Sequence, residues 1–232
     1  MTSPTTAAAP DSAGSTPKPS GEDIKQAASD SLRHDVDIRA RIHDVTLLAL
    51  RSRRFDGYGM REVVRAVTEG IALGAEPSRA DLRQALSDAF RGMDDALTRS
   101  AEAGRVALNQ LVATGKDLSD SEIKQALATI KRLEDDFLST AGQVAAAAKE
   151  KVGPELGRVI DTARVNGTET GKMAASAFTE LAFRFSVASL DMTLAGMEVA
   201  GLVGSRFAQL ASGVLGGIGD ALAERGSDKK LG

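Results

Sequence analysis

The stretch that decides the fold runs from residue 82 to residue 111 and reads LRQALSDAFRGMDDALTRSAEAGRVALNQL. Its apolar or small positions recur every three or four residues, at Leu82, Leu86, Phe90, Met93, Leu97, Ala101, Gly104, Leu108 and Leu111. On a helix this spacing aligns them as one narrow stripe, which is the seam geometry of coiled coils and helical bundles. The stretch therefore predicts one long helix that packs side by side with other helices.

A second stripe follows with the same spacing, at Ile123, Ala126, Ile130, Leu133, Phe137, Ala141, Val144 and Ala148. No alternating strand pattern of useful length occurs anywhere in the sequence. Two narrow stripes on consecutive segments favour antiparallel neighbours. We therefore expect an all-α protein, built as an elongated bundle of long antiparallel helices.

Three segments begin with the same helix-start signature, a serine followed three residues later by an acidic residue, at Ser20, Ser78 and Ser119. Such a serine accepts a hydrogen bond from the backbone of the acidic residue, whose side chain reaches back in return. The three starts are unevenly spaced, which favours duplicated helical units over a solenoid of fixed period. We expect helices over residues 21–54, 60–73 and 78–114, and a further helix from residue 119.

Composition shifts divide the chain into four parts. Residues 1–21 are rich in Ser, Thr, Pro and Ala, which predicts a disordered tail. Residues 22–152 form the predicted bundle, and the Gly153-Pro154 break opens a C-terminal helical region over residues 153–226, which is most apolar over residues 174–222. Residues 227–232 complete the chain as a short tail.

Composition also narrows the classes of function. Aromatic residues make up only 3% of the 232 residues, so burial must come from Ala, Leu, Val and Ile in closely spaced helices. The net charge of -3 argues against a nucleic-acid partner. The absence of cysteine excludes disulfides, thiolate metal sites and thiol nucleophiles.

The most apolar part of the sequence, residues 174–222, carries a row of mostly small side chains. At four-residue spacing come Gly196, Ala200, Gly204, Ala208, Ser212 and Gly216. Such a row lets another backbone or an apolar surface approach closely. Its longest uncharged run, residues 207–219, has thirteen residues, fewer than the roughly 20 needed to span a bilayer. We therefore expect a helix that packs against an apolar partner, and favour this over a membrane anchor.

A basic cluster surrounds the glycine-containing break after residue 54. Its members are Arg51, Arg53, Arg54, Arg61 and Arg65, with Tyr58 among them. Arginine forks match lipid headgroups, phosphate or an acidic partner, so the cluster is the candidate partner-binding surface. The alternative is a solvated helix corner whose charge Asp56 and Glu62 partly compensate.

Catalytic and metal signatures are missing from the sequence. His34 and His43 are nine residues apart, which places them on opposite faces of one predicted helix. No Gly-x-Ser-x-Gly motif and no Gly-Lys-Ser/Thr phosphate loop occurs. We expect no enzyme activity, no metal and no cofactor.

Taken together, long Ala-rich helices with narrow stripes, a Pro/Ala/Ser leader and the lack of Cys and Trp resemble phasins, the bacterial proteins that coat polyhydroxyalkanoate granules, and also apolipoprotein-like helical proteins. The resemblance covers about residues 24–223 and carries over no individual residue. It implies a cytoplasmic, non-enzymatic protein that forms homo-oligomers and binds a lipid membrane or storage granule peripherally.

Two alternatives stay open beside that interpretation. One is a soluble scaffold or adaptor for a protein partner, with the C-terminal helix as the core of an oligomer. The other is a membrane-inserted protein that uses its small-residue row for helix association.

Overall fold

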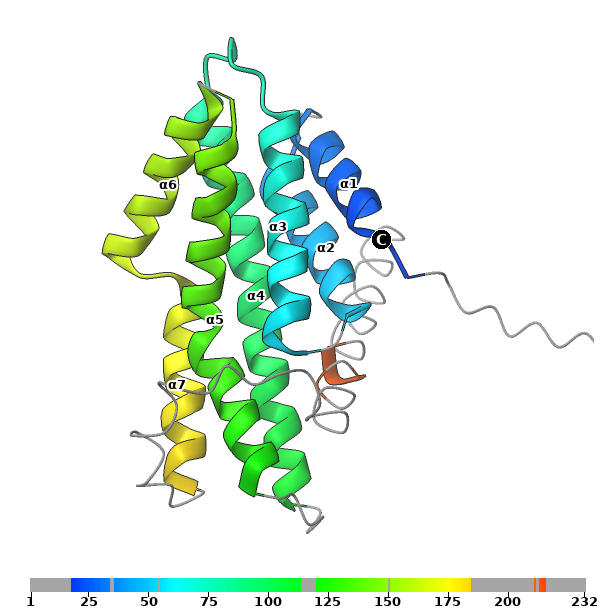
Figure 1. The fold of residues 1–232 in the computed structure, drawn as a ribbon, viewed down its shortest axis with the longest axis vertical. Helices are drawn as coiled ribbons and strands as arrows, with labels where there is room; N and C mark the ends of the chain where they lie inside the picture. The colour runs from blue at the N-terminus through cyan, green and yellow to red at the C-terminus, as the bar shows by residue number, and fades with distance from the viewer. Residues whose placement is uncertain are drawn as a thin grey trace, which may run out of the picture.

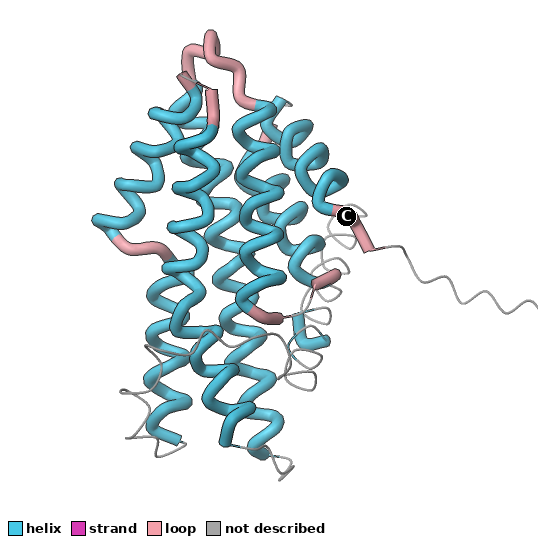
Figure 2. Tube along the Cα trace, in the orientation of Figure 1, coloured by secondary structure: helices cyan, strands magenta, loops and turns pink. Residues whose placement is uncertain are grey.

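The computed structural model describes residues 18–33, 36–53, 55–113, 120–149, 151–184, 211 and 213–215. Within these ranges the chain forms helices and the links between them, and no strand (Figure 2). The named helices of these described ranges are α1 (Gly21–Arg33), α2 (Ile38–Arg51), α3 (Gly57–Gly74), α4 (Leu82–Ala113), α5 (Asp120–Ala147), α6 (Val152–Asn166) and α7 (Glu169–Arg184). The all-α prediction is confirmed.

Figure 1 shows an elongated bundle with α4 and α5 running along most of its length. Helices α1, α2 and α3 lie on one flank, while α6 and α7 follow one another along the other flank. The main packing contacts join α1 to α3, α2 to α4, α3 to α5, and α7 to both α4 and α5. The two longest helices therefore form the axis on which the shorter ones pack.

The predicted stripes form the core. On α4, Leu86, Met93 and Leu97 are almost completely buried, and on α5 the same holds for Ile130 and Phe137. The rings of Phe137 and Phe90 stack with centroids 4.8 Å apart, which joins the two stripes.

The expected first helix over residues 21–54 is wrong, because the structure divides it into α1 and α2. Asp37 has a left-handed backbone conformation with φ of 55°, and its Oδ1 accepts a hydrogen bond from the Ala40 amide at 3.4 Å. Aspartate tolerates this conformation and is a good helix N-cap. No glycine or proline stands between α1 and α2 in the sequence.

The predicted serine caps have different outcomes. Ser20 and Asp23 form the reciprocal pair, with the Asp23 amide 3.1 Å from Ser20 Oγ and the Ser20 amide 2.8 Å from Asp23 Oδ2. The Ser20 hydroxyl also donates to Asp23 Oδ2 at 2.7 Å, and this hydrogen bond, together with that from the Ser20 amide, lowers the pKa of Asp23. The second cap does not form, because Arg79 binds the Asp81 carboxylate with both Nε and Nη2 and α4 begins only at Leu82. Ser119 lies outside the described residues.

Glycines allow two pairs of helices to approach unusually closely. A Cβ atom on Gly70 of α3 would lie 2.2 Å from the Lys25 carbonyl oxygen of α1, and one on Gly74 would lie 2.4 Å from the Ser29 carbonyl oxygen. On α4, a Cβ on Gly92 would lie 2.2 Å from the Arg39 carbonyl oxygen of α2. Because large side chains are scarce, these helices pack through direct contact between their backbones.

Only a small part of the predicted C-terminal helix is described. Residues up to Arg184 belong to α7, and residues 211 and 213–215 are also helical. Ala211 and Leu215 are buried within the same apolar cluster as the other helices. The members of the small-residue row, Gly196, Ala200, Gly204, Ala208, Ser212 and Gly216, lie outside the described residues. In the described part of the chain, no helix has the length and apolar character needed to span a membrane.

Candidate functional site

The basic cluster predicted from the sequence lies where α2 ends and α3 begins. Arg51 and Arg53 are half-buried there, and Arg53 donates a hydrogen bond from Nη2 to the Pro19 carbonyl oxygen at 3.1 Å. This contact ties the segment before α1 to the end of α2. Arg54 lies outside the described residues. Tyr58, in the first turn of α3, is 67% exposed.

The two later members of the cluster lie on α3. Arg61 donates from Nη1 to Asp136 Oδ2 of α5 at 3.0 Å, so it links two helices. Burial raises the pKa of Asp136, and the charge of Arg61 opposes that rise. Arg65, one turn further along α3, is exposed. The cluster as predicted is therefore divided between internal contacts and the surface.

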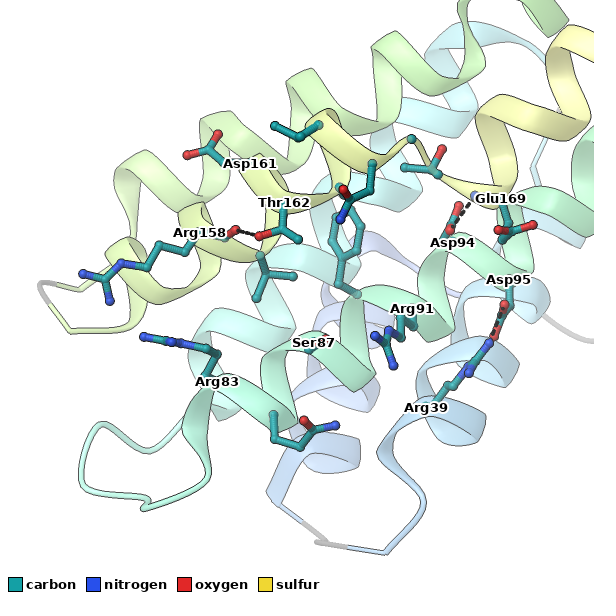
Figure 3. A pocket seen from close by; sticks show the side chains of 18 residues that line it. Arg39, Arg83, Ser87, Arg91, Asp94, Asp95, Arg158, Asp161, Thr162 and Glu169 are labelled. Carbon is teal, nitrogen blue, oxygen red and sulfur yellow. Dashed lines mark hydrogen bonds and ion pairs between the residues drawn. The ribbon is translucent and has the colours of Figure 1, made fainter.

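A second feature, which sequence reasoning did not single out, is a groove of about 990 Å³ over α4. Its floor is the face of α4 that carries Arg83, Ser87 and Arg91. Helix α6 supplies one wall through Arg158 and Thr162, and Arg39 of α2 stands on the other side (Figure 3). The α6–α7 link closes one end with Gly167, Thr168 and Glu169.

Ion pairs hold most of the charged side chains of this groove. Arg39 binds Asp95 with two hydrogen bonds of 2.7 and 3.0 Å, which raises the pKa of the guanidinium. Arg83 binds Glu155 through Nε at 2.8 Å, and Arg158 binds the same carboxylate. The hydrogen bond from Arg83 lowers the pKa of Glu155. The rim of the groove is thus fixed by arginine–carboxylate forks.

The floor of the groove carries hydrogen-bond donors that remain unused. Arg91 is exposed and makes no hydrogen bond or ion pair with the described residues. The hydroxyl of Ser87, one turn earlier on the same face, also has no partner among the described residues. Apolar groups, namely Phe90, Val159 and Ala163, line the side toward α6.

A compact polar junction lies beside the groove, where α7 begins. Asp94 of α4 accepts hydrogen bonds from the backbone amides of Glu169 and Thr170, both at 3.0 Å. Glu134 of α5 accepts from the amide and the hydroxyl of Thr168, at 3.0 and 2.7 Å. Two carboxylates therefore satisfy the free amides at the start of α7 and complement its dipole.

The sequence predicts this junction only weakly. Asn166-Gly167-Thr168 indicates a break, and in the structure Thr168 caps α7, because its Oγ accepts from the Gly171 amide at 2.8 Å. The partners Asp94 and Glu134 are distant in sequence, and nothing in their local patterns separates them from surface acids. The signal that would have found them is their place beside the apolar stripes of α4 and α5.

The groove can recognise an anion through its arginine and hydroxyl donors.

Of the two histidines considered in the sequence, the structure describes His43, which does not line this groove. His43 lies on α2, with Nδ1 2.9 Å from Asp44 Oδ1. His34 lies outside the described residues. No group of three or more His, Asp or Glu side chains in the described part of the chain is placed to hold a metal ion.

By its architecture, the chain is an all-α helical-bundle protein. A model of a family of unknown function, DUF6781, matches residues 15–224, and the chain belongs to that family. Comparison with curated proteins and with solved structures gave no match in either set.

Proposed function

We propose that this chain is a non-enzymatic helical protein that associates with itself and binds a hydrophobic surface, such as a lipid membrane or a storage granule, through its apolar C-terminal segment. The observation that carries the proposal is the burial of Ala211 and Leu215, which docks part of that segment on the bundle through small or single apolar side chains.

Docking of this kind is weak, so contacts with the bundle can be replaced by contacts with another apolar surface. Burying a leucine side chain contributes roughly 1.5–3 kcal/mol, and an alanine contributes less. The segment has many glycines and alanines, whose side chains carry little apolar area to bury. An external apolar surface that accepts the whole segment competes well with such contacts.

The distribution of exposed apolar side chains on the bundle supports the assignment of surface binding to the C-terminal segment and not to the bundle. The large ones among the described residues are scattered over several helices and one link: Val36, Leu48, Tyr58, Leu73, Val165 and Phe183. Scattered single residues are normal on a soluble domain, whereas a binding surface requires a contiguous patch.

Phe183 stands out among these residues because of its position. It lies in the last turn of α7, is 88% exposed and falls within the most apolar part of the sequence, residues 174–222. A large exposed aromatic ring at this point extends the apolar segment back onto the bundle.

The second candidate function is a soluble scaffold whose C-terminal segment forms the core of an oligomer. The same burial of Ala211 and Leu215 favours it, because these side chains are already inside an apolar cluster. The two candidates differ in whether a lipid or polymer surface removes the segment from the bundle.

Truncation after Arg184 tests the proposal. This cut leaves α7 in place, whose Ala177 and Leu181 are buried in the bundle. We expect the full chain to co-sediment with vesicles or polymer granules, and the protein lacking residues 185–232 to stay in the supernatant with unchanged helicity per residue. Equal co-sedimentation of both proteins would contradict the proposal. A full-length oligomer that binds neither surface would favour the scaffold.

A further inference from the structure

We propose that the groove over α4 binds a small organic anion that carries a phosphate or carboxylate group, with Arg91 and Ser87 as its direct contacts. The proposal is independent of the binding of a hydrophobic surface. It rests on donors without acceptors, on the engagement of the neighbouring charged side chains with other groups, and on the apolar wall beside them.

Arg91 and Ser87 form the centre of the site. They are four residues apart on α4, so their side chains are neighbours on one helix face. The Arg91 guanidinium and the Ser87 hydroxyl make no hydrogen bond with the described residues, although both line the same groove. One oxygen of a phosphate or carboxylate bound between them would accept from the hydroxyl, and the others from the guanidinium.

Four arginines and four carboxylates line the groove, and Arg91 is the arginine among them that forms no ion pair with the described residues. Arg83 and Arg158 share the carboxylate of Glu155. The carboxylates that line the groove are held by other groups: Asp95 by Arg39, Asp161 by Arg164, Glu169 by Lys172 and Asp94 by the amides of α7. Asp88 is held by Gln84 at 3.0 Å.

The rest of the groove indicates what accompanies the anionic group. Phe90, Val159 and Ala163 form an apolar strip toward α6, and Phe90 is held in place by stacking on Phe137. The volume of about 990 Å³ is at the upper end of the range of sites for small molecules, roughly 300–1,000 Å³. An anion with an attached ring or short chain therefore fits the groove better than inorganic phosphate.

Calorimetric titration of the full chain with phenyl phosphate and with inorganic phosphate, at constant ionic strength, tests this proposal. We expect phenyl phosphate to bind more tightly, and Arg91→Gln to weaken its binding about tenfold or more, because a charge-assisted contact is lost. Ser87→Ala should weaken it less. Arg99→Gln is the matched control, since Arg99 is exposed on the same helix but does not line the groove, and its affinity should stay within twofold of the parent.

Three results would overturn the proposal. One is the absence of binding by the parent protein. Another is an equal loss of affinity in Arg91→Gln and Arg99→Gln, since this would indicate general charge attraction. The last comes from vesicles that contain phosphatidate: binding to them that depends on Arg91, without binding of phenyl phosphate, would assign the groove to a lipid headgroup and not to a free small molecule.

Discussion

The contact between α1 and α3 and the contact between α4 and α7 hold the same bundle together by opposite means. Between α1 and α3, Gly70 and Gly74 bring the backbones together, and no room remains for even one extra methyl group. Between α4 and α7, Asp94 binds the first amides of α7, and Arg105 of α4 binds Glu180 of α7 at 3.0 Å.

The difference shows where the bundle tolerates change. A contact between backbones fails as soon as a side chain is added, because a helix cannot move locally without losing its neighbouring packing. A polar contact fails when one partner is removed, because the remaining buried group loses its hydrogen bond. The α1–α3 contact is therefore sensitive to added volume, and the α4–α7 contact to lost charge.

The largest effect is expected from adding one methyl group at the α1–α3 contact. Gly70→Ala places a Cβ 2.2 Å from the Lys25 carbonyl oxygen and should lower the free energy of unfolding by roughly 1–3 kcal/mol or more. Gly157→Ala on α6 is the matched control, because its Cβ would meet no atom within 4 Å, and it should raise stability by about 0.5–1 kcal/mol. Urea denaturation measures both. Destabilisation of the same size in both variants would show that close packing is not the cause.

Removal of the cap of α7 should have the next largest effect. Asp94→Ala leaves the amides of Glu169 and Thr170 without their acceptor and should cost about 1–3 kcal/mol. Asp95→Ala, next in sequence, removes only a partly exposed pair with Arg39 and should cost less than about 1 kcal/mol. Thermal unfolding of the two variants tests this order, and a larger loss in Asp95→Ala would contradict it.

The smallest expected effect concerns pH. Hydrogen bonds from Arg105 lower the pKa of Glu102 below its usual value of 4.5, and partial burial opposes this. Because the folded-state pKa is the lower one, the pair contributes stability above about pH 4.5 and loses it as the pH falls through the folded-state pKa. Between pH 6 and pH 3 the parent protein should lose up to about 1 kcal/mol more than Glu102→Gln. Parallel stability curves would show that the pair contributes nothing.

Apolar spacing alone was enough to predict the bundle. The stripe that includes Leu86, Met93 and Leu97 is buried as expected, since a helix turns that spacing into one face. The α1–α2 break escaped prediction because no glycine or proline marks it, and the left-handed conformation of Asp37 cannot be read from an aspartate in a polar stretch.

The candidate sites were harder to predict than the fold. The basic cluster is contiguous in sequence, yet Arg53 and Arg61 point to different partners in space. The groove over α4 combines residues of α2, α4 and α6 whose separation in sequence hides their proximity. Partner binding by Arg51, Arg53, Arg54, Tyr58, Arg61 and Arg65 stays a prediction.

The fluorescence of a single tryptophan tests the binding of a hydrophobic surface most directly, because the chain has no tryptophan of its own. Phe183→Trp and Val165→Trp place the probe at two positions that are 88% and 85% exposed, at the end of α7 and of α6 respectively. On adding vesicles or polymer granules, we expect a blue-shifted emission for the probe at position 183 and an unchanged emission at position 165. Unchanged emission at both positions, or an equal shift at both, would contradict this expectation.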